Sequence, residues 1–209
     1  MKYKICLILV FLFSFSTIEA VPKEKVATEI EGQVREISSF VENGVKVEYK
    51  TSTDDELVLK ELKHNISKSF PEKNITCDEE QITGADNSMD IQANIYVEDN
   101  NTIVEIKIIN YNKEITISDL MKDLSQLKSK NSDGIKYFQY IKGKINYKDK
   151  ILETINNRLA MENISTLDAY NGYVGTANLY DGEKVNFAIS CYDTGSYLIM
   201  GTPIIFATY

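Results

Sequence analysis

Residues 89–111 of the chain read MDIQANIYVEDNNTIVEIKIINY. Apolar and polar residues alternate on both sides of Asn100-Asn101, a pattern that is typical of half-buried β-strands joined by a turn. A further strand-like run precedes this segment. Turn-forming residues between positions 84 and 87 separate the two. The sequence therefore predicts a three-strand antiparallel meander. The expected strands cover 74–80, 89–98 and 102–111.

Helical patterns surround this meander. Apolar residues recur at spacings of three and four over residues 23–42, between Asp54 and Pro71, and again after Ser118. Each pattern predicts an amphipathic helix. Gly44 is expected to end the first helix and Pro71 the second, while Ser118 is expected to cap the third.

The second half of the sequence repeats this order of elements. A strand over 45–51, a helix and a meander in the first half are matched by a strand over 135–146, a helix over 148–162 and strands near 164–168, 172–179, 184–192 and 196–207. We therefore predict an α+β fold made of a duplicated unit, with pseudo-repeats at about 45–134 and 135–209 after an N-terminal helix. Strands linked by hairpins predict a largely antiparallel sheet with helices on one face.

The first twenty residues are typical of a secretory signal peptide. Lys2 and Lys4 precede a short apolar run over residues 5–15, and Ala20 offers a small residue at the cleavage position. The run is too short to span a bilayer as a helix, so we expect residues 1–20 to be removed without leaving a membrane anchor. Residues 21–209 then form one secreted, extracytoplasmic domain.

The amino-acid composition indicates the kind of organism that encodes the chain and the kind of partner that the chain can bind. Lysine greatly outnumbers arginine, and asparagine, isoleucine and tyrosine are abundant, which indicates a low-GC bacterial genome. The formal charge of the chain is −8, and loss of two lysines and one glutamate with the signal peptide makes it −9. An acidic exported protein is not expected to bind nucleic acid.

Two segments carry a family resemblance. The run Ser190–Pro203 (SCYDTGSYLIMGTP) and the run Lys136–Tyr140 (KYFQY), together with the signal peptide and the long helix after it, resemble the YwmB-like family of exported proteins from low-GC Gram-positive bacteria. The resemblance implies a fold likened to the TATA-box-binding protein. No catalytic residues are established for that family, so it implies none here.

The segment Asp193-Thr194-Gly195-Ser196 matches the catalytic loop of aspartic proteases. That chemistry needs two such loops, because two carboxylates share one proton, and the chain has no second copy. The same residues also suit a hairpin turn between two strands. A turn is the preferred interpretation, and an envelope hydrolase that uses Asp193 with a second carboxylate is the alternative.

Other chemistry-bearing residues are sparse. His64 is the only histidine, which excludes a multi-histidine metal site. The acidic clusters at 54–56 and 78–80 lack a calcium-loop pattern, and no glycine-rich phosphate loop is present. Cys77 and Cys191 could remain thiols or form one disulfide. We therefore expect no catalytic residue, metal or cofactor, and a protein that is not an enzyme.

One segment stands out by its charge. Residues 122–150 hold eight lysines against three aspartates, a local charge of +5. Strand alternation places two sets of side chains on opposite faces. The set expected under the helices is Ile135, Tyr137, Ile141 and Ile145. The set expected to be exposed is Lys136, Phe138, Tyr140, Lys142 and Lys144.

Lysines interleaved with aromatic rings can bind an anionic chain, since amines supply attraction and rings supply flat apolar area. The sequence thus predicts a non-catalytic cell-envelope binding protein, whose partner at this strand face is a wall polymer or an envelope protein. A solvated lysine-rich strand is the alternative interpretation of the same pattern. The oligomeric state is left open.

Overall fold

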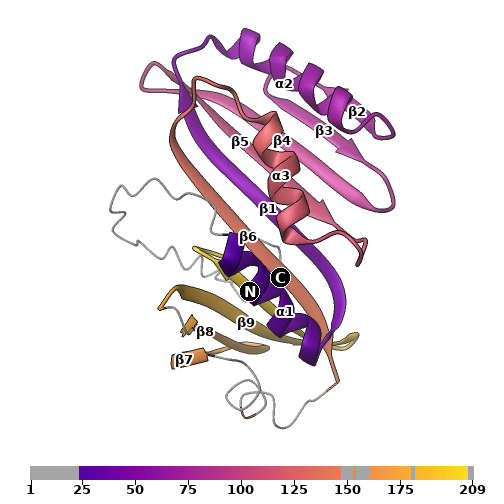
Figure 1. Cartoon of the computed structure of the whole chain (residues 1–209), viewed down its shortest axis with the longest axis vertical. Coiled ribbons are helices and arrows are strands. Elements are labelled where there is room, and N and C mark those ends of the chain that lie inside the picture. Colours follow the sequence, from indigo (N-terminus) through magenta and orange to yellow (C-terminus); the bar gives the residue numbers. More distant parts are fainter. Residues whose placement is uncertain (1–23, 147–152, 154–160, 180–181, 207–209) are drawn as a thin grey trace, which may run out of the picture.

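The computed structural model describes residues 24–146, 153, 161–179 and 182–206. In these residues the chain forms an α+β fold with three helices and one antiparallel sheet of ten strands (Figure 1). The helices are α1 (Glu24–Ile37), α2 (Asp55–Ser69) and α3 (Ile117–Leu127). The strands are β1 (Ser39–Thr51), β2 (Asn74–Cys77), β3 (Gln81–Ala85), β4 (Met89–Glu98), β5 (Asn101–Asn110), β6 (Asp133–Ile145), β7 (Met161–Ala169), β8 (Gly172–Leu179), β9 (Lys184–Tyr192) and β10 (Gly195–Thr202).

The strand order of the sheet is β2-β3-β4-β5-β1-β6-β10-β9-β8-β7. The long strands β1 and β6 pair at its centre, and every pairing between neighbours is antiparallel. The two halves of the sheet are equivalent from edge to centre. One half runs β2-β3-β4-β5-β1, and the other runs β7-β8-β9-β10-β6 in the same succession along the chain. The expected antiparallel sheet of an α+β fold is confirmed.

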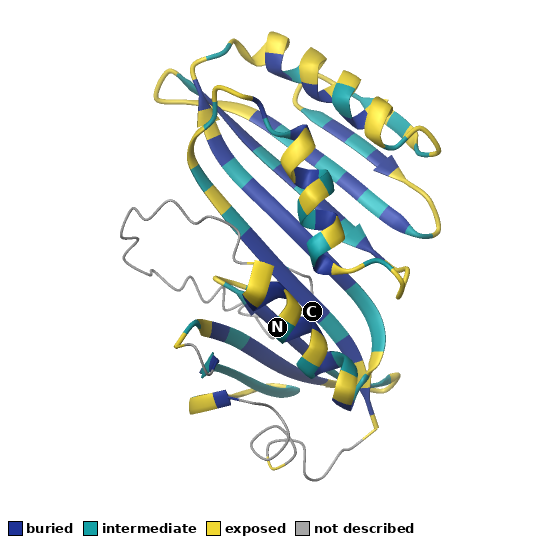
Figure 2. Cartoon of the chain, in the orientation of Figure 1, coloured by how far each residue is buried: buried dark blue, intermediate teal, exposed yellow. Residues whose placement is uncertain are grey.

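The three helices lie on one face of the sheet (Figure 1). Helix α1 packs against β6 and β10, α3 against β1 and β5, and α2 against β3 and β4. On strands such as β4, alternate residues are buried beneath them, which produces the banding in Figure 2. On β5, for example, Val104, Ile106 and Ile108 are buried in one core with Leu120 and Leu124 of α3. The other side of the sheet, which carries no described helix, is called the open face below.

A buried carboxylate joins three elements under the helices. Glu31 of α1 accepts hydrogen bonds from Arg35 Nε and Nη2, from Asn43 Nδ2 on β1 and from the backbone N–H of Ile117. The last of these donors is the first residue of α3, where unpaired N–H groups favour a negative charge. Asn43 also accepts a hydrogen bond from Asn110 on β5 at 2.8 Å. Glu31 therefore fixes how α1 and α3 sit on the central strands.

Several expected boundaries were wrong in the first half. Helix α1 ends at Ile37, and β1 begins at Ser39, so Gly44 lies inside a strand rather than at a helix end. A Cβ atom at Gly44 would lie 2.5 Å from Cε1 of the Tyr140 ring. The glycine is required there because that ring packs directly on the β1 backbone.

The meander has four strands in this half rather than three. The side chain of Asp78 accepts hydrogen bonds from the N–H groups of Glu80 and Gln81, which closes a turn after β2 and allows β3 to form. Thr116, not Ser118, caps α3, and it forms a capping box with Asp119. Phe70 follows the last residue of α2, as the position of Pro71 predicted.

The second half agrees more closely with the expected strands. Strands β8 and β9 have the expected bounds, and β10 is shorter than expected. Most of the helix expected over 148–162 lies outside the described residues, and its last two positions belong to β7. The expected signal peptide also lies outside the described residues.

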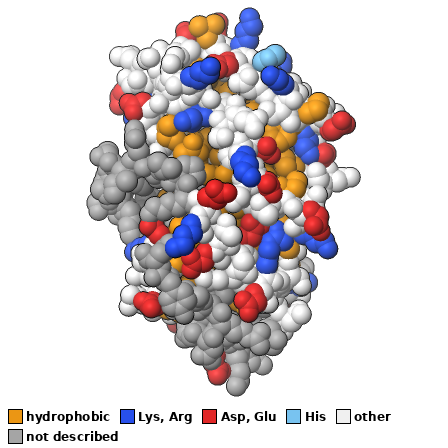
Figure 3. All heavy atoms as spheres, in the orientation of Figure 1, with side chains coloured by type: hydrophobic (Ala, Val, Ile, Leu, Met, Phe, Trp, Pro, Cys, Tyr) orange, Lys and Arg blue, Asp and Glu red, His pale blue; other side chains and the backbone are white. Residues whose placement is uncertain are grey.

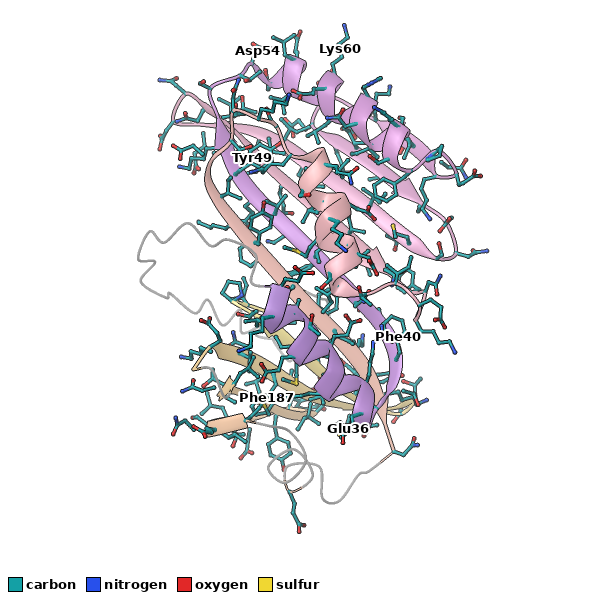
Figure 4. The ribbon with its side chains drawn as sticks, in the orientation of Figure 1. Glu36, Phe40, Tyr49, Asp54, Lys60 and Phe187 are labelled. Carbon is teal, nitrogen blue, oxygen red and sulfur yellow. The ribbon has the colours of Figure 1, made fainter. Side chains whose placement is uncertain are left out.

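Tyr49 of β1 is expected to make the fold less stable at alkaline pH (Figure 4). Burial, and secondarily the charge of Glu61, raises the pKa of Tyr49 to about 12. A pKa raised by folding contributes stability below the unfolded pKa near 10, and this contribution is lost as the pH rises through 12. We expect the free energy of unfolding to fall by roughly 2 to 3 kcal/mol between pH 10 and 12 from this residue.

Urea unfolding followed by circular dichroism at pH 9 to 12 measures this effect. Tyr49→Phe should flatten the alkaline fall, whereas Tyr170→Phe, at a fully exposed ring, should leave it unchanged. An alkaline profile that is the same for Tyr49→Phe and the parent chain would contradict the assignment.

Candidate functional site

The expected division of β6 into two faces agrees with the structure. Ile141 and Ile145 are buried in the core under the helices, and Ile135 and Tyr137 pack against that core. This half of the expectation is confirmed. The lysines and rings of the opposite set lie on the open face, as period-two alternation requires.

The expected exposure of the aromatic residues in that set was wrong. Phe138 is 3% exposed and Tyr140 is 0% exposed. The C-terminal segment after β10 covers this part of the open face, and the ring of Phe206 packs edge-on against Tyr140 with 4.9 Å between centroids. Ala188 and Ile199 complete the apolar cluster around Tyr140. Tyr140 thus belongs to a second small core, and both rings are too buried to be available to a partner.

The lysines of the set differ from one another. Lys136 and Lys144 are exposed, whereas the side chain of Lys142 is 17% exposed. The ammonium group of Lys142 lies 4.0 Å from Glu42 and 5.5 Å from the ring centre of Tyr197 on β10. No carboxylate in the described part of the chain lies within ion-pair distance of Lys144.

Two tyrosines from the β9–β10 hairpin replace the buried rings as neighbours of these lysines. Tyr197 is the direct cross-strand partner of Lys144, and its ring lies 6.0 Å from that of Tyr192. Tyr192 is 37% exposed. We call Lys142, Lys144, Tyr192 and Tyr197 the Lys–Tyr corner. It combines two ammonium groups with two partly exposed rings at one end of the open face.

The turn of that hairpin lies next to the side chain of Lys144. Asp193 and Thr194 are its two central residues, and the segment is therefore the turn that the sequence predicted. Gly195 has φ +134°, and a Cβ atom there would lie 2.6 Å from Cε of Lys144. Glycine is favoured because other residues rarely adopt this φ, and the flexible Lys144 side chain lies against the turn. Asp193 itself is exposed.

Polar side chains form a ladder across the other half of the open face. Gln81 Nε2 donates to Asn94 Oδ1 at 2.9 Å, Asn94 Nδ2 donates to Glu105 Oε1 at 3.2 Å, and Lys46 Nζ binds Glu105 Oε2 at 3.2 Å. Lys46 also lies 4.4 Å from the ring centre of Phe138. The ladder thus runs from β3 through β4, β5 and β1 to β6, and its charges are paired within the sheet.

Lys46 is the most constrained charge in this ladder. Burial disfavours its charged form, but hydrogen bonds and charges from Glu48 and Glu105 outweigh that effect and raise the pKa of Lys46. Its ammonium group is therefore held by two carboxylates and is not available to a ligand. Nearer the centre of the open face, burial and then Glu42 raise the pKa of Tyr140, whose hydroxyl donates to Glu42 at 3.0 Å.

The face that bears the helices has a different character. In Figure 3 lysine and acidic side chains are interspersed over it, and apolar side chains show between the helices. His64 lies exposed on α2. Among the described residues no three metal-ligating side chains of His, Cys, Asp or Glu gather at one point. We find no corresponding concentration of lysines and tyrosines on this face.

The two cysteines in the described residues are free thiols. Cys77 on β2 is partly exposed, and Cys191 at the end of β9 is exposed. Neither is in a disulfide. They lie in opposite halves of the sheet. None of the helices in the described ranges combines the length and the apolarity needed to cross a bilayer.

Sequence reasoning missed Tyr192 and Tyr197. It placed the rings of the site on the same strand as the lysines, because alternation along one strand is visible in the sequence. The register between β10 and β6 brings Tyr197 beside Lys144, and that register depends on pairing between segments more than 50 residues apart. The available signal was the hairpin around Asp193, which places both tyrosines on one face.

Comparisons with known proteins add little to this picture. No protein-family model matches the chain, and no curated protein matches it. Among solved structures, the chain is similar to the crystal structure of DynU16, described as a protein of the dynemicin biosynthetic locus. The identity is 8% and the TM-score is 0.27, over 76% of this chain and 85% of that one. A likeness at this level carries no inference about the chain.

Proposed function

We propose that this protein is a non-catalytic binding protein of the cell envelope, which holds an anionic wall polymer at the Lys–Tyr corner. One observation carries the proposal: Lys142 and Lys144 lie beside Tyr192 and Tyr197 on the open face of the sheet. Ammonium groups attract phosphate or carboxylate charges, and the flat rings provide apolar area for the repeating backbone between them. A polyol phosphate of the teichoic-acid type has this alternation of charge and carbon chain.

The charge balance of the corner supports a polyanion rather than a single ion. Lys144 is exposed, and Lys142 is only loosely paired with Glu42 at 4.0 Å. Glu42 already accepts the hydroxyl hydrogen of Tyr140, which reduces its hold on the lysine. Two ammonium groups on one short stretch of strand are better matched to charges that repeat along a chain.

The location in the envelope is part of the proposal. It is supported by the sequence of residues 1–20, which is typical of a signal peptide, and by the acidic composition, which disfavours nucleic acid. We further propose membership of the YwmB-like family and a fold of the TATA-box-binding-protein type, produced by duplication. The equivalent strand order on the two sides of the β1–β6 pair supports a duplication with pseudo-repeats at about 45–134 and 135–209 after the N-terminal helix. An envelope hydrolase is not favoured, since Asp193 lies in an exposed hairpin turn.

Charge reversal at the corner tests the proposal. The double variant Lys142→Glu/Lys144→Glu should adsorb to isolated walls about tenfold more weakly than the parent chain at low salt, because two ionic contacts are replaced by repulsion. The salt dependence of adsorption should also be shallower, since fewer screened contacts remain. Sedimentation of the protein with walls over a range of salt concentrations measures both quantities.

The matched control is Lys60→Glu/Lys63→Glu, which changes the net charge equally on the exposed surface of α2 (Figure 4). It should adsorb nearly as well as the parent. Walls stripped of polyol phosphate should retain neither protein. Equal losses in both double variants, or undiminished adsorption by the corner variant, would contradict the proposal.

A further inference from the structure

A hollow lies on the open face at the opposite end from the Lys–Tyr corner. A depression of about 330 Å³ is lined by Asp78, Glu80, Gln81, Asn94, Ile95 and Tyr96. We call it the β3–β4 depression. Tyr96 is in register with Ile103 and Lys50 at the end of β1, whereas the Lys–Tyr corner is in register with Ser39 at its start. These positions are roughly 35 Å apart along the strand, so the two sites are separate.

The amide side chains of the depression are largely bonded to one another. One of the two side-chain N–H groups of Gln81 donates to Asn94 Oδ1, and one of those of Asn94 donates to Glu105. Asp78 Oδ1 accepts the N–H groups of Glu80 and Gln81, which holds the carboxylate at the rim and leaves its second oxygen for a ligand. The carboxylates of Asp78 and Glu80 are therefore the strongest hydrogen-bonding groups that the site offers, and they call for a ligand that donates hydrogen bonds.

The charged residues that line the depression are all acidic. Its lining contains two carboxylates and no lysine or arginine. The ring of Tyr96 is 49% exposed, which leaves a face for a ligand. Burial, followed by the charges of Glu48, Glu98 and Glu105, raises the pKa of Tyr96. Acidic residues beyond the lining therefore add to a negative potential at the ring, and Lys46 opposes it only in part.

We propose that the β3–β4 depression binds an organic ammonium group, with the cation over the Tyr96 ring and its N–H groups toward Asp78, Glu80 and Gln81. A cation is attracted both by the ring face and by the carboxylates, whereas a neutral donor gains only the hydrogen bonds. The ammonium group can belong to an amino sugar or to a lysine side chain. This inference does not rest on the proposed function, because it concerns a cation at a different place.

Titration of the isotope-labelled protein with butylammonium, followed by nuclear magnetic resonance, tests the inference. Shifts should centre on residues 78–81 and 94–96, and the neutral analogue N-butylacetamide should bind at least about fivefold more weakly. Glucosamine and Nα-acetyl-lysine methylamide then distinguish the two sources, with N-acetylglucosamine as the uncharged partner of the first. Equal affinity for a charged ligand and its neutral partner would overturn the inference.

Single variants locate the binding. Tyr96→Leu and Glu80→Gln should each weaken butylammonium binding about fivefold. Tyr170→Leu and Glu114→Gln make the same changes at exposed positions outside the depression and should leave binding unchanged. Circular dichroism establishes that each variant is folded. Parent-like affinity in a folded Tyr96→Leu variant, or shifts centred elsewhere, would also overturn the inference.

Discussion

Replacing Tyr140 with alanine is expected to lower the free energy of unfolding by about 4 kcal/mol. The ring is 0% exposed, it packs on Phe206, Ala188 and Ile199, and it lies directly over Gly44. Its removal leaves a cavity between the sheet and the C-terminal segment that neither side can fill, because both are held by the strands around them. Urea unfolding followed by circular dichroism measures the change.

Two further variants separate the ring from its hydroxyl group. Tyr140→Phe keeps the packing and loses only the hydrogen bond to Glu42, so a decrease of about 1 kcal/mol is expected. Tyr170→Ala removes a fully exposed ring and should change stability by less than about 0.5 kcal/mol. If Tyr140→Ala were as stable as Tyr170→Ala, the ring would be a surface residue, as its alternation with lysines first suggested.

The variant Glu31→Ala is expected to lower the free energy of unfolding by about 3 kcal/mol. The side chain is 8% exposed and accepts four hydrogen bonds, two of them from Arg35. Its removal leaves the N–H of Ile117 without a partner at the start of α3. It also leaves Arg35 without its carboxylate, although that guanidinium still lies 4.5 Å from the ring centre of Phe40.

The control for this variant lies on the same helix. Glu36→Ala removes an exposed carboxylate from α1 and should change stability by less than about 0.5 kcal/mol (Figure 4). Hydrogen exchange adds a test of mechanism, since the first turn of α3 should lose protection in Glu31→Ala although the substitution is in α1. An unchanged exchange rate at Ile117 would show that the two helices are not coupled through Glu31.

Local patterns in the sequence were sufficient for most strands and helices. Alternation and the flanking turn residues located β4, β5, β8 and β9 within about a residue, and on β4 and β5 the alternation arises because one face of each strand lies under a helix. The short strand β3 was not found, since its existence depends on how Asp78 accepts two backbone N–H groups. That is a property of the folded turn and leaves no periodic signal.

The sequence predicted the candidate site less well than the strands, because the site also depends on contacts between distant segments. Alternation correctly sorted Lys142 and Lys144 away from Ile141 and Ile145. It did not show that Phe206, more than 60 residues later, covers Tyr140. Which segment covers a face of the sheet depends on the path of the chain in space. The alternation along one strand shows only which of its residues lie on the same face.

The most direct test of the central claim is to map where a soluble polyanion binds. Titration of the isotope-labelled protein with polyglycerol phosphate at low ionic strength, observed by nuclear magnetic resonance, reports every backbone amide at once. The account predicts shifts centred on Lys142, Lys144, Tyr192 and Tyr197 that diminish as salt is added. Shifts centred on α2 or on the β3–β4 depression, or no shifts at low ionic strength, would contradict it.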